Sequence, residues 1–268
     1  KIKKGVVWLF KLLNISYKLY MEEKEIIEIN KNGWNELVRS GKNYSNTSLP
    51  EYGPFMRNEE YFNIFKDVKN KKVLELGCAK GESLKYLQTK GASEVWEIDI
   101  SEEQIKYAKN NVPTGKFFVS AMEDNPGIPE NYFDYCLSLY SIGFSSSLEK
   151  TLALVSSYLN KDGKFVFCWT HPFFNCLGIA KDKVVIRKSY NNEALANITK
   201  GEDKIPMVQY NFKISTIINA MIKSGLTIEK MIEDKPIQEN HIGNYKSNFW
   251  DKRKIDSAPT TLIIIAKK

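Results

Sequence analysis

The apolar residues of this chain change their spacing along the sequence. From Val6 to Tyr20 they recur three or four positions apart, with lysines between them. This is the spacing of one helical face, so the sequence predicts an amphipathic helix within residues 1–30. Such a basic helix can lie on a membrane surface, although packing against the chain's own core is commoner. Residues 31–58 are rich in Gly, Pro, Asn and Ser, which indicates an irregular segment with short helical pieces.

From Lys72 onward, short apolar runs alternate with helical stretches, a pattern typical of β-α-β units in a mostly parallel sheet. Ser101 and Gln104 have the spacing of a capping box, and Ser215 and Gly225 are expected to start and end a later helix. Residues 173–214 are too long for a plain connector and predict a lid, or alternatively a hairpin packed elsewhere. The predicted strands are 72–76, 94–99, 116–120, 133–139, 163–170, 227–232 and 260–266, and the predicted helices are 83–90, 101–111, 148–159 and 216–224.

Composition narrows the class of protein. The 268 residues carry 39 Lys and Arg against 32 Asp and Glu, a formal net charge of +7, and only four of the basic residues are arginine. Arginine, whose planar fork binds phosphates, is scarce and the lysines are spread evenly, so nucleic-acid binding is not expected. The apolar run from Gly5 to Phe10 is too short to span a bilayer, and no cleavage site follows it. We expect a cytoplasmic globular protein, monomeric or homodimeric, without integral membrane association.

The cysteines and histidines do not suggest a metal site. His171 and His241 have no carboxylate cluster at ligand spacing, so no metal is predicted. Free thiols in a reducing compartment are expected because no C-x-x-C pair occurs among Cys78, Cys136, Cys168 and Cys176.

The most informative stretch is the turn after the first predicted strand. Residues 73–81 read Val-Leu-Glu-Leu-Gly-Cys-Ala-Lys-Gly, a strand followed by a small-residue turn and a helix. Gly77 and Gly81 allow the backbone to approach a ligand, and the helix start offers unpaired N–H groups. A dinucleotide fingerprint requires a third glycine where this chain has Glu82, which would repel a pyrophosphate. Glu75, at the strand end, suits a ligand with an ammonium group.

This stretch resembles the first motif of the class I S-adenosylmethionine-dependent methyltransferases, through Glu75, Gly77 and Gly81. An ordinary strand–helix turn of another α/β protein is the alternative. Ala79 replaces the middle glycine of the family's motif, and binding is expected to survive if its φ angle is below zero. The resemblance covers residues 72–170 well, residues 215–268 moderately and the first 60 residues hardly at all.

The resemblance implies a doubly wound α/β fold. Its seven-stranded, mostly parallel sheet would have the order 3-2-1-4-5-7-6, with the last strand antiparallel between the fifth and sixth. The chain would then consist of an N-terminal helical cap segment, residues 1–60, and an S-adenosylmethionine-binding methyltransferase domain, residues 61–268. Residues 173–214 would be a lid insertion in that domain.

Further cofactor contacts are expected where later strands end. Asp99 can accept both ribose hydroxyls as a forked pair, and Ile100 can lie against the adenine. By resemblance, adenine is read by the stretch after the third strand. There Ala121 replaces a common Asp, which leaves recognition to backbone near Met122 and to Glu123, although a solvated loop carboxylate is the alternative for Glu123.

The end of the fourth strand completes the predicted cofactor site. Residues 139–144 should face the methyl donor because ligands of open α/β sheets bind outside the carboxyl ends of the strands. The polar-Pro-Pro-aromatic tetrapeptide of methyltransferases that act on adenine N6 or glutamine is absent from this place. The predicted cofactor-binding residues are Glu75, Gly77, Cys78, Ala79, Gly81, Asp99, Ile100, Ala121, Met122, Glu123, Leu139 and Tyr140.

His171 follows the fifth strand and therefore emerges at the same edge of the sheet. It is the candidate catalytic residue, a general base for a hydroxyl or amine, and the alternative is a histidine that shapes a turn. Candidate substrate contacts are Tyr52, Phe144, His171 and Tyr210. The predicted function is transfer of the S-adenosylmethionine methyl group to O, N or C of a small molecule, leaving S-adenosylhomocysteine. A non-catalytic cofactor-binding module, or less favoured a nicotinamide-dependent oxidoreductase, remains an alternative.

Overall fold

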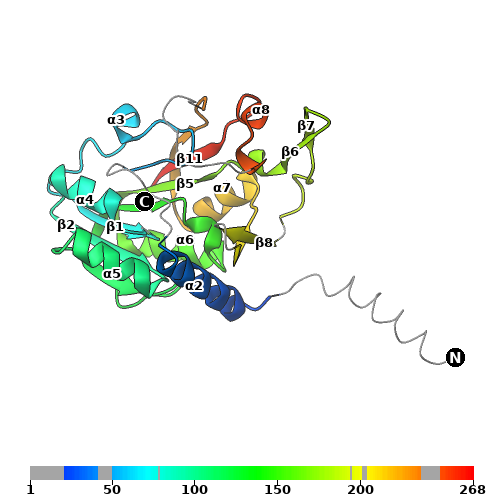
Figure 1. Ribbon diagram of the computed structural model, residues 1–268. Helices are drawn as coiled ribbons and strands as arrows, with labels where there is room; N and C mark the ends of the chain where they lie inside the picture. Colours follow the sequence, from blue (N-terminus) through cyan, green and yellow to red (C-terminus); the bar gives the residue numbers. More distant parts are fainter. Residues whose placement is uncertain (1–20, 42–49, 78, 194, 201–203, 237–247) are drawn as a thin grey trace.

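A seven-stranded sheet forms the centre of the computed structural model (Figure 1). The structure describes residues 21–41, 50–77, 79–193, 195–200, 204–236 and 248–268. The strands lie in the order β10-β11-β5-β4-β1-β2-β3, and β11 is antiparallel to both neighbours. This order confirms the predicted fold, including the position of the antiparallel strand. The bounds are β1 Lys72–Leu76, β2 Glu94–Asp99, β3 Lys116–Val119, β4 Phe133–Leu139, β5 Leu159–Thr170, β10 Thr227–Ile232 and β11 Thr261–Lys267.

Helices cover both faces of the sheet because successive strand residues point to opposite sides. Val73 packs with Leu84 of one helix, whereas its neighbour Leu74 belongs to the cluster that holds Leu152 of another. The sheet is thus apolar on both faces, as its near-continuous apolar strands require. The helices are α2 Glu23–Arg39, α3 Glu59–Phe62, α4 Glu82–Thr89, α5 Glu102–Asn111, α6 Leu148–Tyr158, α7 Ile214–Lys223 and α8 Lys252–Ile255, with short 3-10 turns η1 Ile142–Phe144, η2 Phe174–Cys176 and η3 Asn248–Trp250.

The first long helix extends beyond the predicted one. α2 continues through residues expected to be irregular, because Gly33 is not a breaker here but a point of close approach. A Cβ on Gly33 would lie 2.6 Å from the carbonyl oxygen of Pro206. The buried face of α2 therefore continues past Asn30 to Leu37. Residues 1–20, which hold most of the predicted amphipathic helix, lie outside the described residues.

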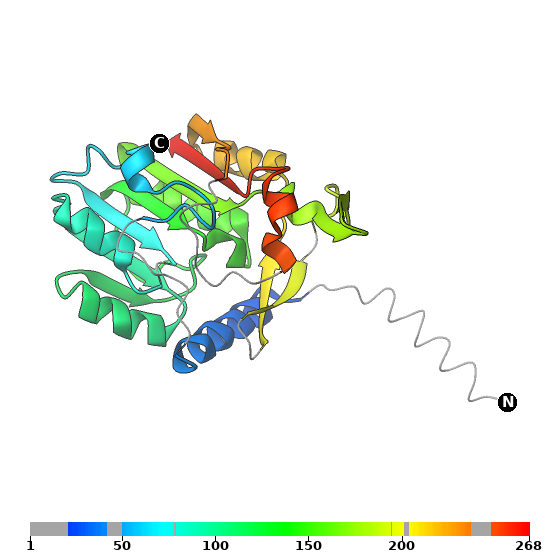
Figure 2. The ribbon, with the colours of Figure 1, turned by 45° about the horizontal axis from the view of Figure 1, so that its top comes forward.

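The segment predicted as a lid contains two antiparallel hairpins. The first consists of β6 Leu177–Ala180 and β7 Lys183–Ile186, and the second of β8 Leu195–Lys200 and β9 Ile205–Tyr210. The second hairpin lies beside α2 (Figure 2), and β9 contacts this helix near Asn30 and Gly33. The first packs against α8 through a small apolar cluster that includes Phe174, Leu177 and Ile255.

The start of α7 differs from the prediction. The helix begins at Ile214 and not after Ser215, and no side chain of its own first turn caps it. The first N–H groups are instead bonded by the preceding segment: Lys213 N donates to Glu193 Oε2 at 2.9 Å, and Ile214 N to Tyr190 Oη at 3.1 Å. The predicted end is confirmed, since Gly225 follows α7 with φ of +83°.

The predicted start of α5 is also confirmed. Ser101 is the N-cap, and its hydroxyl accepts a hydrogen bond from Gln104 N at 3.1 Å. The Oε1 atom of Gln104 is buried with no hydrogen-bond partner among the described residues. Only the serine half of the predicted capping box is therefore made through these atoms.

The described helices and cysteines bear on two further expectations. Among the described helices, none is both long and apolar enough to cross a membrane. Cys136, Cys168 and Cys176 are buried and unpaired, as the sequence predicts, and Cys78 lies outside the described residues.

Candidate active site

The turn after β1 is held close to the loop after β4. Gly77 has a φ of +73°, and a Cβ on it would lie 2.4 Å from Cβ of Ser141 and 3.8 Å from Cε of Met122. Ser141 Oγ donates to the carbonyl oxygen of Leu76. Glycine at 77 is thus required both by the backbone conformation and by close packing. The structure brings Gly77 together with Met122, as the site prediction requires.

Ala79 does not meet the condition set for it from the sequence. Its φ is +58°, in the left-handed region, and not below zero. An alanine there costs roughly 1–2 kcal/mol of backbone strain. The conformation directs Ala79 N–H toward Asp99, whose Oδ2 accepts at 3.3 Å. The turn after β1 is therefore fastened to the end of β2, while Cys78 between Gly77 and Ala79 lies outside the described residues.

Gly81 lies at the start of the helix after this turn, and its role in the approach of a ligand stays a prediction. It is the N-cap of α4 with φ of +74°, and a Cβ on it would lie 3.4 Å from Ala108 and Val112 of the α5 region. A side chain here would thus point to the neighbouring helix. The glycine is needed for the turn and for packing of α4 against α5.

Asp99 lies at the carboxyl end of β2 with both oxygens held by backbone. Oδ1 accepts from Ser101 N at 2.7 Å, and Oδ2 accepts from Ala79 N. Burial raises the pKa of Asp99 to about 6, against the effect of these two hydrogen bonds. A carboxylate has about four acceptor positions, so two remain for other donors. The arrangement suits a pair of adjacent hydroxyl groups, and Ile100 beside it is half-buried.

Glu75 is a buried carboxyl group at the end of β1. Its Oε2 atom has no hydrogen-bond partner among the described residues. Burial, then the charges of Glu82 and Asp99, raise the pKa of Glu75 to about 8. An unpaired buried carboxylate is costly, and a cationic ligand would remove that cost. The chemistry of Glu75 and Asp99 together therefore fits S-adenosylmethionine, which carries ammonium, sulfonium and ribose hydroxyl groups.

The stretch after β3 is only partly as expected. Glu123 is buried, which rules out the solvated-loop alternative, and its Oε1 accepts from Ser146 N at 2.7 Å and from Ser146 Oγ. Burial raises its pKa. Ala121 is also buried, and its carbonyl oxygen accepts from Asp124 N. Glu123 thus connects two loops at this edge, and Met122, beside Gly77, is the better placed of the three for a ligand.

An aromatic wall, defined here as Trp34, Tyr140, Phe144 and Trp169, lies beside this edge, with Phe144 and Trp169 buried in the core and Trp34 and Tyr140 half-buried. Trp34 and Phe144 meet edge-to-face at 5.1 Å between ring centroids, as do Phe144 and Trp169 at 5.4 Å, and Tyr140 lies 5.6 Å from Trp169. The site residues predicted from the sequence omit both tryptophans. Trp169 was recognisable from its place near the end of β5, and Trp34 belongs to the N-terminal aromatic residues that the sequence suggests as a roof over an apolar pocket.

Tyr140 itself has an unusual backbone. Its φ is +60°, and its hydroxyl is 2.8 Å from Thr261 Oγ1 on β11. Leu139 before it is half-buried at the strand end. Left-handed aromatic residues are uncommon, and such strain is concentrated at functional sites.

Two predicted substrate contacts lie elsewhere. Tyr52 is completely buried in the core on the α4 side, and its hydroxyl donates to Glu59 Oε2 at 2.5 Å. Its burial leaves no surface for a substrate. Tyr210 stacks on Phe212 at 5.3 Å, and both line an open groove of ≈ 470 Å³ between the start of α6 and α7. None of the predicted cofactor residues lines that groove.

His171 is at the expected edge, but both ring nitrogens are engaged. Nδ1 accepts from Phe173 N at 3.2 Å, and Nε2 is 2.7 Å from Glu233 Oε1. The backbone N of His171 donates to the carbonyl oxygen of Thr260 at 2.9 Å. These contacts are those of a histidine that shapes a turn, so general-base catalysis remains a prediction from the sequence. His241 lies outside the described residues, and the part of the chain that is described holds no cluster of three or more metal-ligating side chains.

Comparison with known proteins agrees with this geometry. Residues 74–167 match the family model of the methyltransferase domain. An uncharacterized protein of Haemophilus influenzae is 26% identical over 225 residues, 76% of this chain and 84% of that protein. The human mitochondrial arginine-hydroxylase NDUFAF5 is 30% identical over 97 residues, only 35% of this chain and 27% of that protein. The structure of an S-adenosylmethionine-dependent methyltransferase from Mesorhizobium loti has a TM-score of 0.60 at 21% identity, covering 75% and 92% of the two chains.

The strand order, the turn after β1 and the match over residues 74–167 define a class I methyltransferase domain. Among the solved structures that share this fold are S-adenosylmethionine-dependent methyltransferases.

Proposed function

We propose that this protein transfers the methyl group of S-adenosylmethionine to a small, largely apolar acceptor held against Trp34 and Tyr140, the half-buried members of the aromatic wall. The observation that carries the proposal is the placement of that wall beside the candidate cofactor edge. Tyr140 is followed directly by Ser141, which contacts both Gly77 and Leu76. An acceptor on the wall would therefore lie next to a cofactor bound at Gly77.

The buried polar groups would hold the cofactor. Asp99 would accept the ribose hydroxyls, Glu75 would pair with the ammonium group, and Met122 would lie beside the adenine. When bound, the cofactor supplies a methyl group on a sulfonium, which is already a good leaving group. The protein's own contribution is then mainly alignment of the acceptor and exclusion of water, which requires no covalent nucleophile.

Residues outside the central sheet would close the site. The proposal assigns residues 1–60 to a cap and residues 173–214 to a lid over the acceptor. The packing of α2 on β9 and of Trp34 on Phe144 supports a joint role of these two segments. Tyr52 and Met56 nevertheless belong to the core of the sheet, so the cap is continuous with the domain that it covers.

Calorimetry tests the cofactor part of the proposal. S-adenosylmethionine and S-adenosylhomocysteine should bind, and NAD should not. Asp99→Ala should weaken binding by about 1–3 kcal/mol because the ribose hydroxyls lose a charged acceptor. Asp134→Ala is the matched control. Asp134 lies near the start of β4, at the opposite end of the strand from the candidate site, and it accepts from Lys72 N at 2.9 Å. Equal effects of the two substitutions would remove Asp99 from the cofactor site.

Turnover tests the acceptor part. Transfer of an isotopically labelled methyl group would be followed with a panel of phenols, amines and carboxylic acids of graded size. Methylation of apolar aromatic members is the expected result. Cofactor binding without transfer to any member would instead support a non-catalytic binding module.

A further inference from the structure

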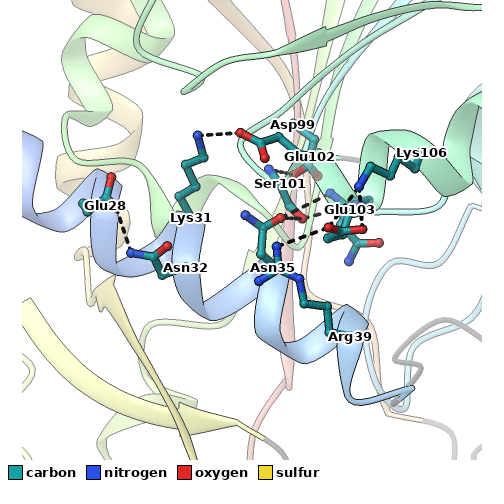
Figure 3. A network of polar contacts seen from close by, with 11 residues as sticks. Glu28, Lys31, Asn32, Asn35, Arg39, Asp99, Ser101, Glu102, Glu103 and Lys106 are labelled. Atoms are coloured by element: carbon teal, nitrogen blue, oxygen red, sulfur yellow. Dashed lines mark hydrogen bonds and ion pairs between the residues drawn. The ribbon is translucent and has the colours of Figure 1, made fainter.

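Helix α2 carries two buried asparagines that face different parts of the site. Asn30 donates through Nδ2 to the carbonyl oxygens of Phe144 and Val208 at 3.0 and 2.9 Å. Asn35 accepts through Oδ1 from Ser101 Oγ at 2.8 Å and from Glu103 N at 3.2 Å. The helix is therefore fastened at one point to Phe144 of the aromatic wall and to β9. At another point it is fastened to the first turn of α5, as Figure 3 shows.

The contact made by Asn35 leads directly to Asp99. Ser101 is fully buried, and its backbone N donates to Asp99 Oδ1 while its hydroxyl accepts from Gln104 N. The Ser101 hydroxyl has one proton, and that proton is directed to Asn35. Asn35 thereby holds Ser101 and the first turn of α5 in place, and the backbone N–H of Ser101 in turn holds one oxygen of the Asp99 carboxylate.

Two ion pairs also join α2 to the first turn of α5, but they contribute less to holding it in place. Lys31 contacts Glu102 at 2.7 Å and Arg39 contacts Glu103 at 3.2 Å. These side chains are partly or largely exposed, and solvent screens such pairs. The buried Asn35 contact, with two donors and no water access, is the more specific connection.

We propose that Asn35 is a positioning residue for the Asp99 carboxylate, and that helix α2 thereby makes ribose recognition depend on the N-terminal segment. The inference rests on the proposed function, because it requires that Asp99 binds the ribose. Asn35 lies 64 residues before Asp99, and its hydrogen bonds are to Ser101 and Glu103, which are not among the predicted cofactor-binding residues. Its effect is therefore on the orientation of the carboxylate and on the first turn of α5.

The test uses S-adenosylhomocysteine and its 2′,3′-dideoxy analogue, measured by calorimetry with the full chain. Asn35→Ala should weaken binding of S-adenosylhomocysteine about tenfold. Binding of the dideoxy analogue should change little, because it has no ribose hydroxyls to present to Asp99. Asn35→Asp should restore binding, since a carboxylate accepts the same two hydrogen bonds and is favourable at a helix N-terminus.

Asn30→Ala is the matched control. It loosens the same helix at the aromatic wall, so it should lower thermal stability while leaving the ratio of affinities for the two ligands unchanged. An equal loss of ribose discrimination in both variants would overturn the inference and reduce Asn35 to an anchor of α2.

Two further outcomes are distinguishable. If Asn35→Ala does not fold, Ser101→Ala removes the bridging hydroxyl alone and should give the same ribose-specific loss; an unchanged ratio would overturn the inference. If the wild-type chain binds S-adenosylhomocysteine and its dideoxy analogue equally, Asp99 does not bind the ribose, and the proposed cofactor assignment fails together with the inference. If Asn35→Ala still prefers S-adenosylhomocysteine to the dideoxy analogue as strongly as the wild type does, the inference fails but the cofactor assignment stands.

Discussion

The ring of Tyr140 lies against the α-carbon of Gly53, so closely that a Cβ on Gly53 would be 2.0 Å from Cε2 of Tyr140. The segment that holds Gly53 is also bonded next to β11, since Thr260 Oγ1 donates to the carbonyl oxygen of Pro54 at 3.2 Å. The contact with Gly53 holds the ring of Tyr140 in place, and with it one end of the aromatic wall.

Gly53→Ala should therefore be much more damaging than an ordinary glycine substitution. Gly127→Ala is the control, because Gly127 has φ of +102°, close to the +96° of Gly53, but no atom within 4 Å of the added Cβ. Both variants bear the backbone strain, and only Gly53→Ala adds a clash with a ring. We expect Gly53→Ala to lower the free energy of unfolding by about 1–3 kcal/mol more than the control, measured by urea unfolding. Equal losses would mean that Tyr140 moves aside freely.

Cofactor affinity should depend on pH through Glu75. Burial raises its pKa to about 8, so the group is mostly protonated at pH 6. A cationic ligand favours the ionised form, so binding should release a proton, and affinity should rise from pH 6 to 8. Calorimetry in buffers of different ionisation enthalpy measures both quantities. Glu75→Gln should flatten the dependence, while Glu94→Gln, whose carboxyl has a lowered pKa, should not. A wild-type affinity independent of pH would contradict this assignment.

The raised pKa of Glu75 also determines how the folding stability of the ligand-free protein changes with pH. The folded pKa of Glu75 lies above its ordinary value of 4.5, so the folded state keeps a proton that the unfolded chain has lost. The contribution of Glu75 to folding stability is then present below about pH 4.5 and is lost as the pH rises to 8. Glu75→Gln should remove this loss, so the variant gains stability over the wild type at pH 8 but not at pH 4.5.

Much of the sheet was predictable because its signals are local. β1, β2, β4 and β10 have the predicted bounds, since each is a short segment of strand-like sequence bordered by turn residues. Asp99 was predictable as a site residue for a related reason: the carboxyl ends of parallel strands meet at one edge, so a polar residue at a strand end is already placed.

The remaining features depend on contacts between distant segments. Glycine normally weakens a helix, and its place at position 33 inside α2 is explained by the close approach of the Pro206 carbonyl oxygen. The sign of φ at Ala79 follows from its hydrogen bond to Asp99 and not from its own preference. Asn35 resembles any polar helical residue until Ser101 is placed against it. No pattern within one segment contains these relationships.

Gly33→Ala should reverse the usual effect of replacing glycine in a helix. Alanine normally stabilises a helix interior by about 1 kcal/mol. Here the added Cβ would be 2.6 Å from Pro206 O, a backbone atom, so α2 and β9 must separate. We expect a net loss of about 1–3 kcal/mol in the free energy of unfolding. Asn32→Ala, on the exposed side of the same helix, should be close to neutral. A stabilised Gly33→Ala protein would show that α2 does not pack tightly on β9.

The last prediction separates the two roles of His171. A neutral imidazole that accepts from Phe173 N at Nδ1 must carry its proton at Nε2, which then donates to Glu233 Oε1 at 2.7 Å. In this state neither nitrogen has a free lone pair with which to take a proton from an acceptor. The ring is buried while the Glu233 side chain is half-exposed, so the pair can open only from the Glu233 side.

His171→Gln should therefore lower the free energy of unfolding by about 1–2 kcal/mol, because a glutamine satisfies only part of this geometry. Cofactor affinity should be unchanged, and the methylation rate should fall less than about tenfold with its pH profile retained. Glu233→Gln keeps a partner for Nε2 and should have a smaller effect on stability. The rate and its pH dependence are decisive: if His171 is a general base, His171→Gln loses about 100-fold or more and the step near neutral pH disappears, while Glu233→Gln keeps that step. Such a result in a stably folded variant would mean that His171 leaves Glu233 when the acceptor binds, and would restore it to the chemistry.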